Sequence, residues 1–190
     1  EASLTGHLVL ATLHTNSAPE SIIRLLDMGM DPFNFADALL GILAQRLARR
    51  LCSKCRLAYT PDDAEITHML NEYAEELKNT PEWQANPDAA FAALRAAWLR
   101  AFADKNGQYR LYRAVGCAEC SNTGYKGRVG LHELLLGSDA AKKLIQEHAR
   151  VAQLLACALH EGMRTLKQDG IEKVLQGITD MAQIRAVCIK

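Results

Sequence analysis

Two Cys-x-x-Cys pairs, Cys52/Cys55 and Cys117/Cys120, constrain this chain more than any other feature of its sequence. Each pair turns two thiolates toward one point, and two such pairs supply the four ligands of a tetrahedral zinc site. Residues 56–116 separate the pairs, a longer stretch than in common zinc ribbons. Because the entropy cost of closing a loop rises only logarithmically with its length, the pairs can still meet. We therefore predict a structural Zn²⁺ held by all four cysteines.

The alternative, in which these thiols are free or form disulfides, fits the rest of the chain less well. Disulfide scaffolds are small secreted chains, whereas the stretch 1–4 is neither basic nor followed by a long apolar core, so no signal peptide is expected. Four thiolates also leave no open coordination position for water, which disfavours catalysis by the metal. Cys157 and Cys188 are not expected to be ligands. The sequence indicates a reducing, cytoplasmic compartment and contains no apolar run long enough to cross a bilayer.

A formal net charge of zero conceals an alternation along the chain. Residues 38–60 hold five basic and no acidic side chains, residues 62–104 nine acidic and three basic, and residues 105–130 five basic and one acidic. The basic stretches flank both cysteine pairs, which keeps open a zinc-ribbon-like nucleic-acid-binding module. The zero net charge, the acidic stretch and the lack of interleaved aromatic residues disfavour it. A stand-alone zinc module for protein interaction is a second alternative.

The apolar periodicity predicts an α/β, helix-rich chain. Leu8–Leu13 is almost wholly apolar and predicts a strand buried in a parallel sheet. Apolar residues spaced by three and four predict a long helix from about Phe35 to Leu51. Strands are also expected over 108–115 and 127–136. The other helices are expected over residues 62–79, 89–102, 139–148, 151–161 and 164–176, with a last helix capped by Thr179.

Three polar residues, His14, Thr15 and Asn16, follow the first predicted strand. In open parallel sheets the ligand crevice lies beyond the carboxyl ends of the strands, where such residues can contact a phosphate or an attacking water. His7 lies at the opposite end of the strand, so it is not expected in that crevice. A lone histidine at a strand end is more often a hydrogen-bonded structural residue, and this alternative stays open.

The segment Thr5-Gly-His-Leu-Val-Leu-Ala-Thr-Leu-His-Thr-Asn16 resembles the histidine box of the secretion ATPase superfamily. The similarity continues through residues 23–29, 43–52 and 116–136. The four cysteines point to the branch of type II secretion E-proteins and type IV pilus extension motors, and away from retraction motors. The resemblance covers residues 1–58 and 105–190, whereas 61–104 is a longer acidic insertion.

This resemblance implies the C-terminal part of a RecA-like P-loop ATPase domain with an inserted tetracysteine zinc-binding subdomain. Residues 1–51 would belong to the ATPase core, with the histidine-box strand. Residues 52–130 would form the zinc subdomain, including the acidic helical insertion 61–104, and residues 131–190 a C-terminal helical subdomain. His14 would sense the γ-phosphate with Thr15 and Asn16 orienting it, and His7 would serve the subunit interface or a neighbouring site.

The resemblance also implies a full-length parent that forms a homo-hexamer and uses ATP and Mg²⁺ to drive pseudopilus or pilus assembly. Such a motor would lie in the cytoplasm, peripheral to the inner membrane, through contacts with platform and cytoplasmic neck proteins. No nucleic acid and no direct membrane insertion are expected. The chain contains no Gly-x-x-x-x-Gly-Lys-Ser/Thr phosphate loop, so by itself it is expected to be inactive as an ATPase.

Overall fold

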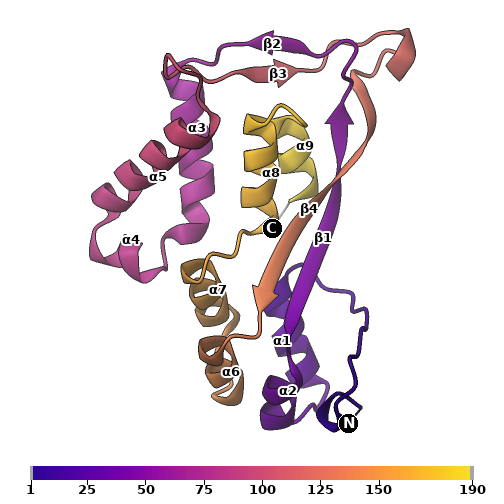
Figure 1. Ribbon diagram of the computed structural model, residues 1–190, viewed down its shortest axis with the longest axis vertical. Helices are drawn as coiled ribbons and strands as arrows, with labels where there is room; N and C mark the ends of the chain where they lie inside the picture. Colours follow the sequence, from indigo (N-terminus) through magenta and orange to yellow (C-terminus); the bar gives the residue numbers. More distant parts are fainter. Residues whose placement is uncertain (1, 189–190) are drawn as a thin grey trace. The chain divides into compact units, whose positions relative to one another are not determined.

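The computed structural model describes residues 2–188, which form two compact units. Unit 1 combines Glu1–Ala44 with Glu133–Thr165, and unit 2 combines Gln45–His132 with Leu166–Lys190. Strands β1 (Gly41–Leu51) and β4 (Tyr125–Leu136) pair in a two-stranded sheet and run antiparallel in Figure 1. Each of these strands contributes residues to both units. The division into three consecutive segments, residues 1–51, 52–130 and 131–190, stays a prediction.

Unit 1 is mainly helical. It contains η1 (Ser3–Thr5), α1 (Ala18–Asp27), α2 (Pro32–Ala38), α6 (Asp139–Gln146) and α7 (Val151–His160). Helix α2 packs on α6, α6 on α7, and α1 on α7. Ser17 and Asp31 begin α1 and α2, because each side chain accepts a backbone N–H of the first turn and a proline follows within that turn. The predicted helix at 139–148 and the one at 151–161 are confirmed to within two residues.

The long helix predicted over Phe35–Leu51 is wrong. Helix α2 ends at Ala38, Leu39 is extended, and Gly41–Leu51 is strand β1. Pairing with β4 gives the backbone of β1 its hydrogen-bond partners, and this tertiary contact overrides a local pattern with helical spacing. The pairing is close, since a Cβ at Gly41 would lie 3.0 Å from the Leu135 carbonyl oxygen.

The strand predicted over Leu8–Leu13 is also wrong for this structure. The segment has neither helical nor strand structure, and its side chains are exposed, Leu10 at 89%. A strand needs a neighbour to accept and donate its backbone hydrogen bonds, and no strand within the described residues pairs with it. An apolar composition suits a buried strand, but it does not supply the neighbouring strand.

Unit 2 carries the rest of the secondary structure. Its elements are β2 (Leu57–Tyr59), α3 (Asp63–Ala74), η2 (Glu75–Leu77), α4 (Pro81–Ala85), α5 (Pro87–Phe102), β3 (Leu111–Arg113), η3 (Ala118–Cys120), α8 (Leu166–Leu175) and α9 (Met181–Val187). Strands β2 and β3 pair antiparallel, with Ala58 opposite Tyr112 (Figure 1). The strand predicted over 127–136 is confirmed as β4, whereas only Leu111–Arg113 of the stretch 108–115 forms a strand.

The acidic insertion is built into the core of unit 2. Trp98 of α5 is 3% exposed and makes edge-to-face contacts with Tyr73 and Phe102. The Tyr73 hydroxyl donates to Glu172 at 2.7 Å, and buried Gln168 donates its side-chain amide to the Tyr73 carbonyl. The same cluster of buried side chains includes Leu70 and Ile171, so α3 and α5 pack with α8 as one core. The insertion is therefore part of the fold of this unit.

Glu72 of α3 is the centre of a charge cluster that reaches α8 and α9. Its carboxylate accepts from Arg185 Nε at 3.1 Å and lies 3.7 Å from Lys167 Nζ and 3.1 Å from His68 Nε2. The hydrogen bond from Arg185 holds the pKa of Glu72 below its usual value, against the effect of partial burial. A depressed carboxyl pKa stabilises the fold above the unfolded-state pKa, and this contribution is lost as the pH falls through the folded-state pKa.

Glu72→Gln is expected to lower the free energy of unfolding of unit 2 by about 1–2 kcal/mol at pH 7, because charge-assisted hydrogen bonds exceed exposed ion pairs in strength. Urea titrations at several pH values should show the difference from the unmodified chain shrinking as the pH falls below about 4.5. Glu75→Gln is the matched control, since Glu75 pairs with Lys78 on the exposed surface. A pH-independent difference would contradict the assignment of this stabilisation to the Glu72 charge.

Candidate metal centre

The structure brings the two cysteine pairs together in unit 2. Cys52 follows β1 directly, and Cys55 lies one turn later. Cys117 is the N-cap of η3, and Cys120 is the last residue of that helix. All four Sγ atoms lie within 4.8 Å of one another. The Cys52–Cys117 distance is 4.0 Å, and Cys55–Cys120 and Cys117–Cys120 are both 3.8 Å. These four cysteines can hold a metal ion.

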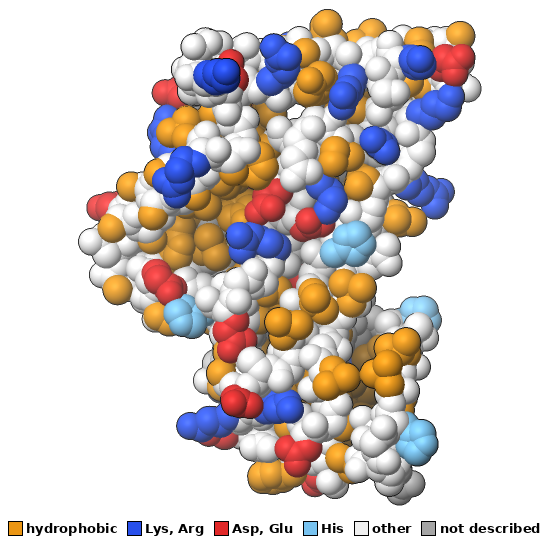
Figure 2. Space-filling view, viewed as in Figure 1, with side chains coloured by type: hydrophobic (Ala, Val, Ile, Leu, Met, Phe, Trp, Pro, Cys, Tyr) orange, Lys and Arg blue, Asp and Glu red, His pale blue; other side chains and the backbone are white. Residues whose placement is uncertain are grey.

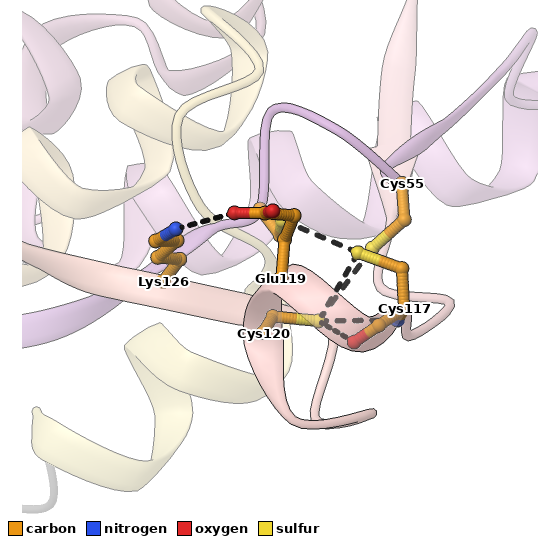
Figure 3. Close-up of polar contacts among 6 residues, drawn as sticks. Cys55, Cys117, Glu119, Cys120 and Lys126 are labelled. Carbon is orange, nitrogen blue, oxygen red and sulfur yellow. Dashed lines mark hydrogen bonds and ion pairs between the residues drawn. The ribbon is translucent and has the colours of Figure 1, made fainter.

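Backbone N–H groups point at the sulfur atoms. The Cys117 and Gly124 amides each donate to Cys120 Sγ at 3.2 Å, and the Gly116 amide donates to Cys55 Sγ at 3.4 Å. Figure 3 shows the side chains of Cys55, Cys117 and Cys120 converging on one point. Gly116 and Gly124 both have positive φ, and a Cβ at Gly124 would lie 2.6 Å from Ala114 Cβ. The tight loops therefore require glycine where the amides approach sulfur.

Cys55 and Cys120 differ in the direction of their pKa shifts. Burial acts to raise the pKa of Cys120, but the Cys117 and Gly124 amides outweigh it and lower the pKa to about 6. Burial raises the pKa of Cys55 to about 11, although the Gly116 amide acts in the opposite direction. Hydrogen bonds among the sulfurs act in opposite directions on the two groups: they lower the pKa of Cys120, whose sulfur accepts, and raise the pKa of Cys55, whose thiol donates. A cation bound among the four sulfurs would stabilise several thiolates together.

The loops that carry the cysteines are tied to the segment 177–180. The Leu51 amide donates to the Ile178 carbonyl at 2.9 Å, and the Thr179 hydroxyl donates to the Arg49 carbonyl at 2.8 Å. The Tyr125 hydroxyl donates to Asp180 at 2.6 Å. Asp180, and not Thr179 as predicted, is the N-cap of α9. Tyr125 and Asp180 were missed in the sequence, since nothing in their local spacing marks a contact across the chain.

Exposed lysine and arginine side chains belong to the same unit as the four cysteines. The Glu119 carboxylate binds Lys126 Nζ at 2.9 Å (Figure 3). Lys54, Arg113 and Arg128 are also exposed in unit 2. Figure 2 shows blue side chains spread over the end of this unit that carries β2 and β3. Pairing with Glu119 raises the pKa of Lys126, and the nearby Cys52 and Cys117 sulfurs act in the same direction.

The histidine segment belongs to unit 1 and is exposed over most of its length. His14 and Asn16 are exposed, and Thr15 is partly buried. Thr15 Oγ1 lies 3.3 Å from the Ser17 carbonyl, to which it donates. His7 Nδ1 lies 3.2 Å from Thr5 Oγ1, so His7 is bound locally within the first turn of the chain. The consecutive residues His14–Asn16 stay candidates for phosphate contact, and the described structure contains no phosphate loop for them to meet.

No described helix is long and apolar enough to cross a membrane. Cys157 lies on α7 of unit 1 and Cys188 follows α9, and neither belongs to the four-sulfur cluster. The expectation that these two cysteines are not part of that ligand set agrees with the structure.

Comparisons with known proteins agree with the motifs. A family model described as Type II/IV secretion system protein matches residues 1–186. The type IV pilus assembly ATPase PilB of Thermus thermophilus is 38% identical over 190 residues, which are 100% of this chain and 18% of that protein. The type II secretion system ATPase E of Vibrio cholerae is 37% identical over 187 residues, and the type II secretion system protein E of Dickeya dadantii 39% over 184. These matches cover 98% and 97% of this chain but only 31% and 30% of the two relatives.

Proposed function

Because the chain belongs to the Type II/IV secretion system protein family, we propose that it is part of a motor ATPase that powers pseudopilus or pilus assembly. The observation that carries this proposal is the match over residues 1–186 together with relatives named as pilus and secretion ATPases. The chain spans less than a third of each of the three relatives described above. ATP and Mg²⁺ binding therefore belongs, in this proposal, to a longer parent with a RecA-like core.

The parent is proposed to work as a homo-hexamer in the cytoplasm, held at the inner membrane by platform and neck proteins. Unit 2 is proposed to brace the motor and to present a surface to these partners. The structure of the four-cysteine cluster supports a rigid module, because its loops are fastened to β1, β4 and the start of α9.

The metal is proposed to be a structural Zn²⁺. Zn–S bonds of about 2.3 Å in a tetrahedron separate the sulfur atoms by about 3.8 Å. Three of the sulfur pairs lie at 3.8–4.0 Å, and all pairs within 4.8 Å, so only small adjustments close the site around one ion. When bound, the ion would neutralise the thiolates and fix the loops at Cys52 and Cys117 to each other.

In the full-length parent, His14 is proposed to sense the γ-phosphate, with Thr15 and Asn16 orienting it and His7 serving a subunit interface. Exposure of His14 and Asn16 supports this, since a sensing side chain must be reachable by nucleotide. His14→Ala in the full-length parent is expected to lower kcat for ATP hydrolysis about hundredfold, the usual loss for one donor to transition-state charge. Steady-state turnover with purified parent measures it.

His148→Asn is the matched control, because His148 is an exposed histidine at positive φ, which asparagine tolerates. It should leave turnover unchanged. Full activity of His14→Ala would remove the sensor assignment, and an inactive full-length parent would remove the ATPase proposal. The 190-residue chain alone should show no turnover, because it has no phosphate loop.

A further inference from the structure

The start of α1 has a complete set of hydrogen-bond partners. The first N–H groups of a helix have no acceptor within the helix. Here the Glu20 amide donates to Ser17 Oγ at 3.3 Å, and Pro19 has no N–H. The Ala18 amide donates at 2.8 Å to Oε1 of Glu133, a residue 115 positions away on β4. The first residue of α1 is therefore fixed by a contact across unit 1.

Glu133 is an unusual residue for its position. It is 3% exposed, and the neighbouring positions on the same side of β4, Leu131 and Leu135, are fully buried leucines. A carboxylate there loses its hydration, a cost that a leucine would avoid. The positive end of the α1 dipole and the Ala18 amide offset that cost. The contact with α1 gives this buried carboxylate a hydrogen-bond donor that a leucine at 133 would not need.

The same helix turn holds the histidine segment. Thr15 Oγ1 donates to the Ser17 carbonyl at 3.3 Å. Its oxygen also lies 2.5 Å from Ser21 Oγ, which can donate its proton either to Thr15 Oγ1 or to the Ser17 carbonyl 3.0 Å away. A continuous set of contacts thus runs from Glu133 through the first turn of α1 to Thr15, next to His14.

We propose that Glu133 is a positioning residue that fixes where the His14–Asn16 segment joins the start of α1. It thereby sets where the side chains of that segment meet a bound nucleotide. This rests on the proposed function. Glu133 touches no nucleotide in this arrangement and acts through Ala18, Ser17 and Thr15. Without its carboxylate, the first turn of α1 loses an acceptor and the start of the helix can shift.

Three variants of the full-length parent test this proposal. Glu133→Leu removes the acceptor, Glu133→Gln keeps an oxygen that can accept from Ala18, and Leu135→Ala destabilises the same strand without removing the contact. Glu133→Leu is expected to lower kcat about ten- to hundredfold, because small displacements of reacting groups have effects of this size. Its KM for ATP should change little, as expected for an interaction made in the transition state. Glu133→Gln should restore most of kcat.

A second measurement needs no activity. Amide hydrogen exchange of residues 18–21 in the chain itself should accelerate in Glu133→Leu more than in Leu135→Ala. If Glu133→Leu and Leu135→Ala lose kcat in proportion to their melting temperatures, the positioning role is overturned while the proposed function stands. If the unmodified parent hydrolyses no ATP, the proposed function fails, and with it this role of Glu133.

Discussion

Cys52→Ser is expected to abolish metal binding and to destabilise unit 2 by about 5 kcal/mol or more. Structural Zn²⁺ contributes an apparent 10–16 kcal/mol to small zinc modules, which equals or exceeds the whole stability of a typical domain. Cys52 is 1% exposed. In the variant, bulk water therefore cannot reach the ion to take the place of the lost thiolate unless the loop opens. Elemental analysis should give about one Zn²⁺ per chain for the unmodified protein and much less for the variant, with a lower melting temperature.

Cys157→Ser is the control for this experiment, since Cys157 is a partly buried thiol outside the cluster. It should keep the metal and most of the stability. A chelator strong enough to remove the ion from the unmodified chain should reproduce the Cys52→Ser melting curve. If Cys52→Ser keeps one equivalent of zinc and its melting temperature, the tetrathiolate site would have to be abandoned.

Trp98→Ala is expected to lower the free energy of unfolding of unit 2 by about 3–5 kcal/mol, the usual range for removing a large buried aromatic side chain. Trp98 lies in the acidic insertion, and its buried side chain belongs to the same core cluster as Leu166 and Ile171 of α8, which lie outside the insertion. The loss should appear in the main unfolding transition of unit 2, measured by denaturant titration. A separate, earlier transition limited to residues 61–104 would contradict an integrated core.

Trp83→Ala is the matched control within the same insertion. Trp83 is partly exposed and makes one edge-to-face contact, with Phe91 at 6.2 Å. Trp83→Ala should lower the free energy of unfolding by about 0.5–1.5 kcal/mol, the contribution of one aromatic pair. Equal losses for Trp83 and Trp98 would indicate that the insertion is stabilised by contacts within itself and not by its packing on α8.

The sequence determined the four-cysteine cluster and the family. Two Cys-x-x-Cys pairs predict a four-sulfur site whatever lies between them, because the ligand type and the local turn are encoded within a few residues. The cluster of Cys52, Cys55, Cys117 and Cys120 is confirmed, and so is the family resemblance read from the histidine box and the segments around the cysteines. The helices at 139–148 and 151–161 were predictable for the same reason, since their caps and periodicity are local.

The tertiary structure alone decided what depended on a distant partner. Gly41–Leu51 has helical spacing but is a strand, because β4 supplies its hydrogen bonds. Leu8–Leu13 has a strand composition but forms none, because no described strand lies beside it. In the sequence, nothing distinguishes Glu133 from an exposed polar residue; only the structure shows that its carboxylate accepts a hydrogen bond from the Ala18 amide. Backbone hydrogen bonds and buried charges must be satisfied by some partner, and a local sequence pattern does not say which one.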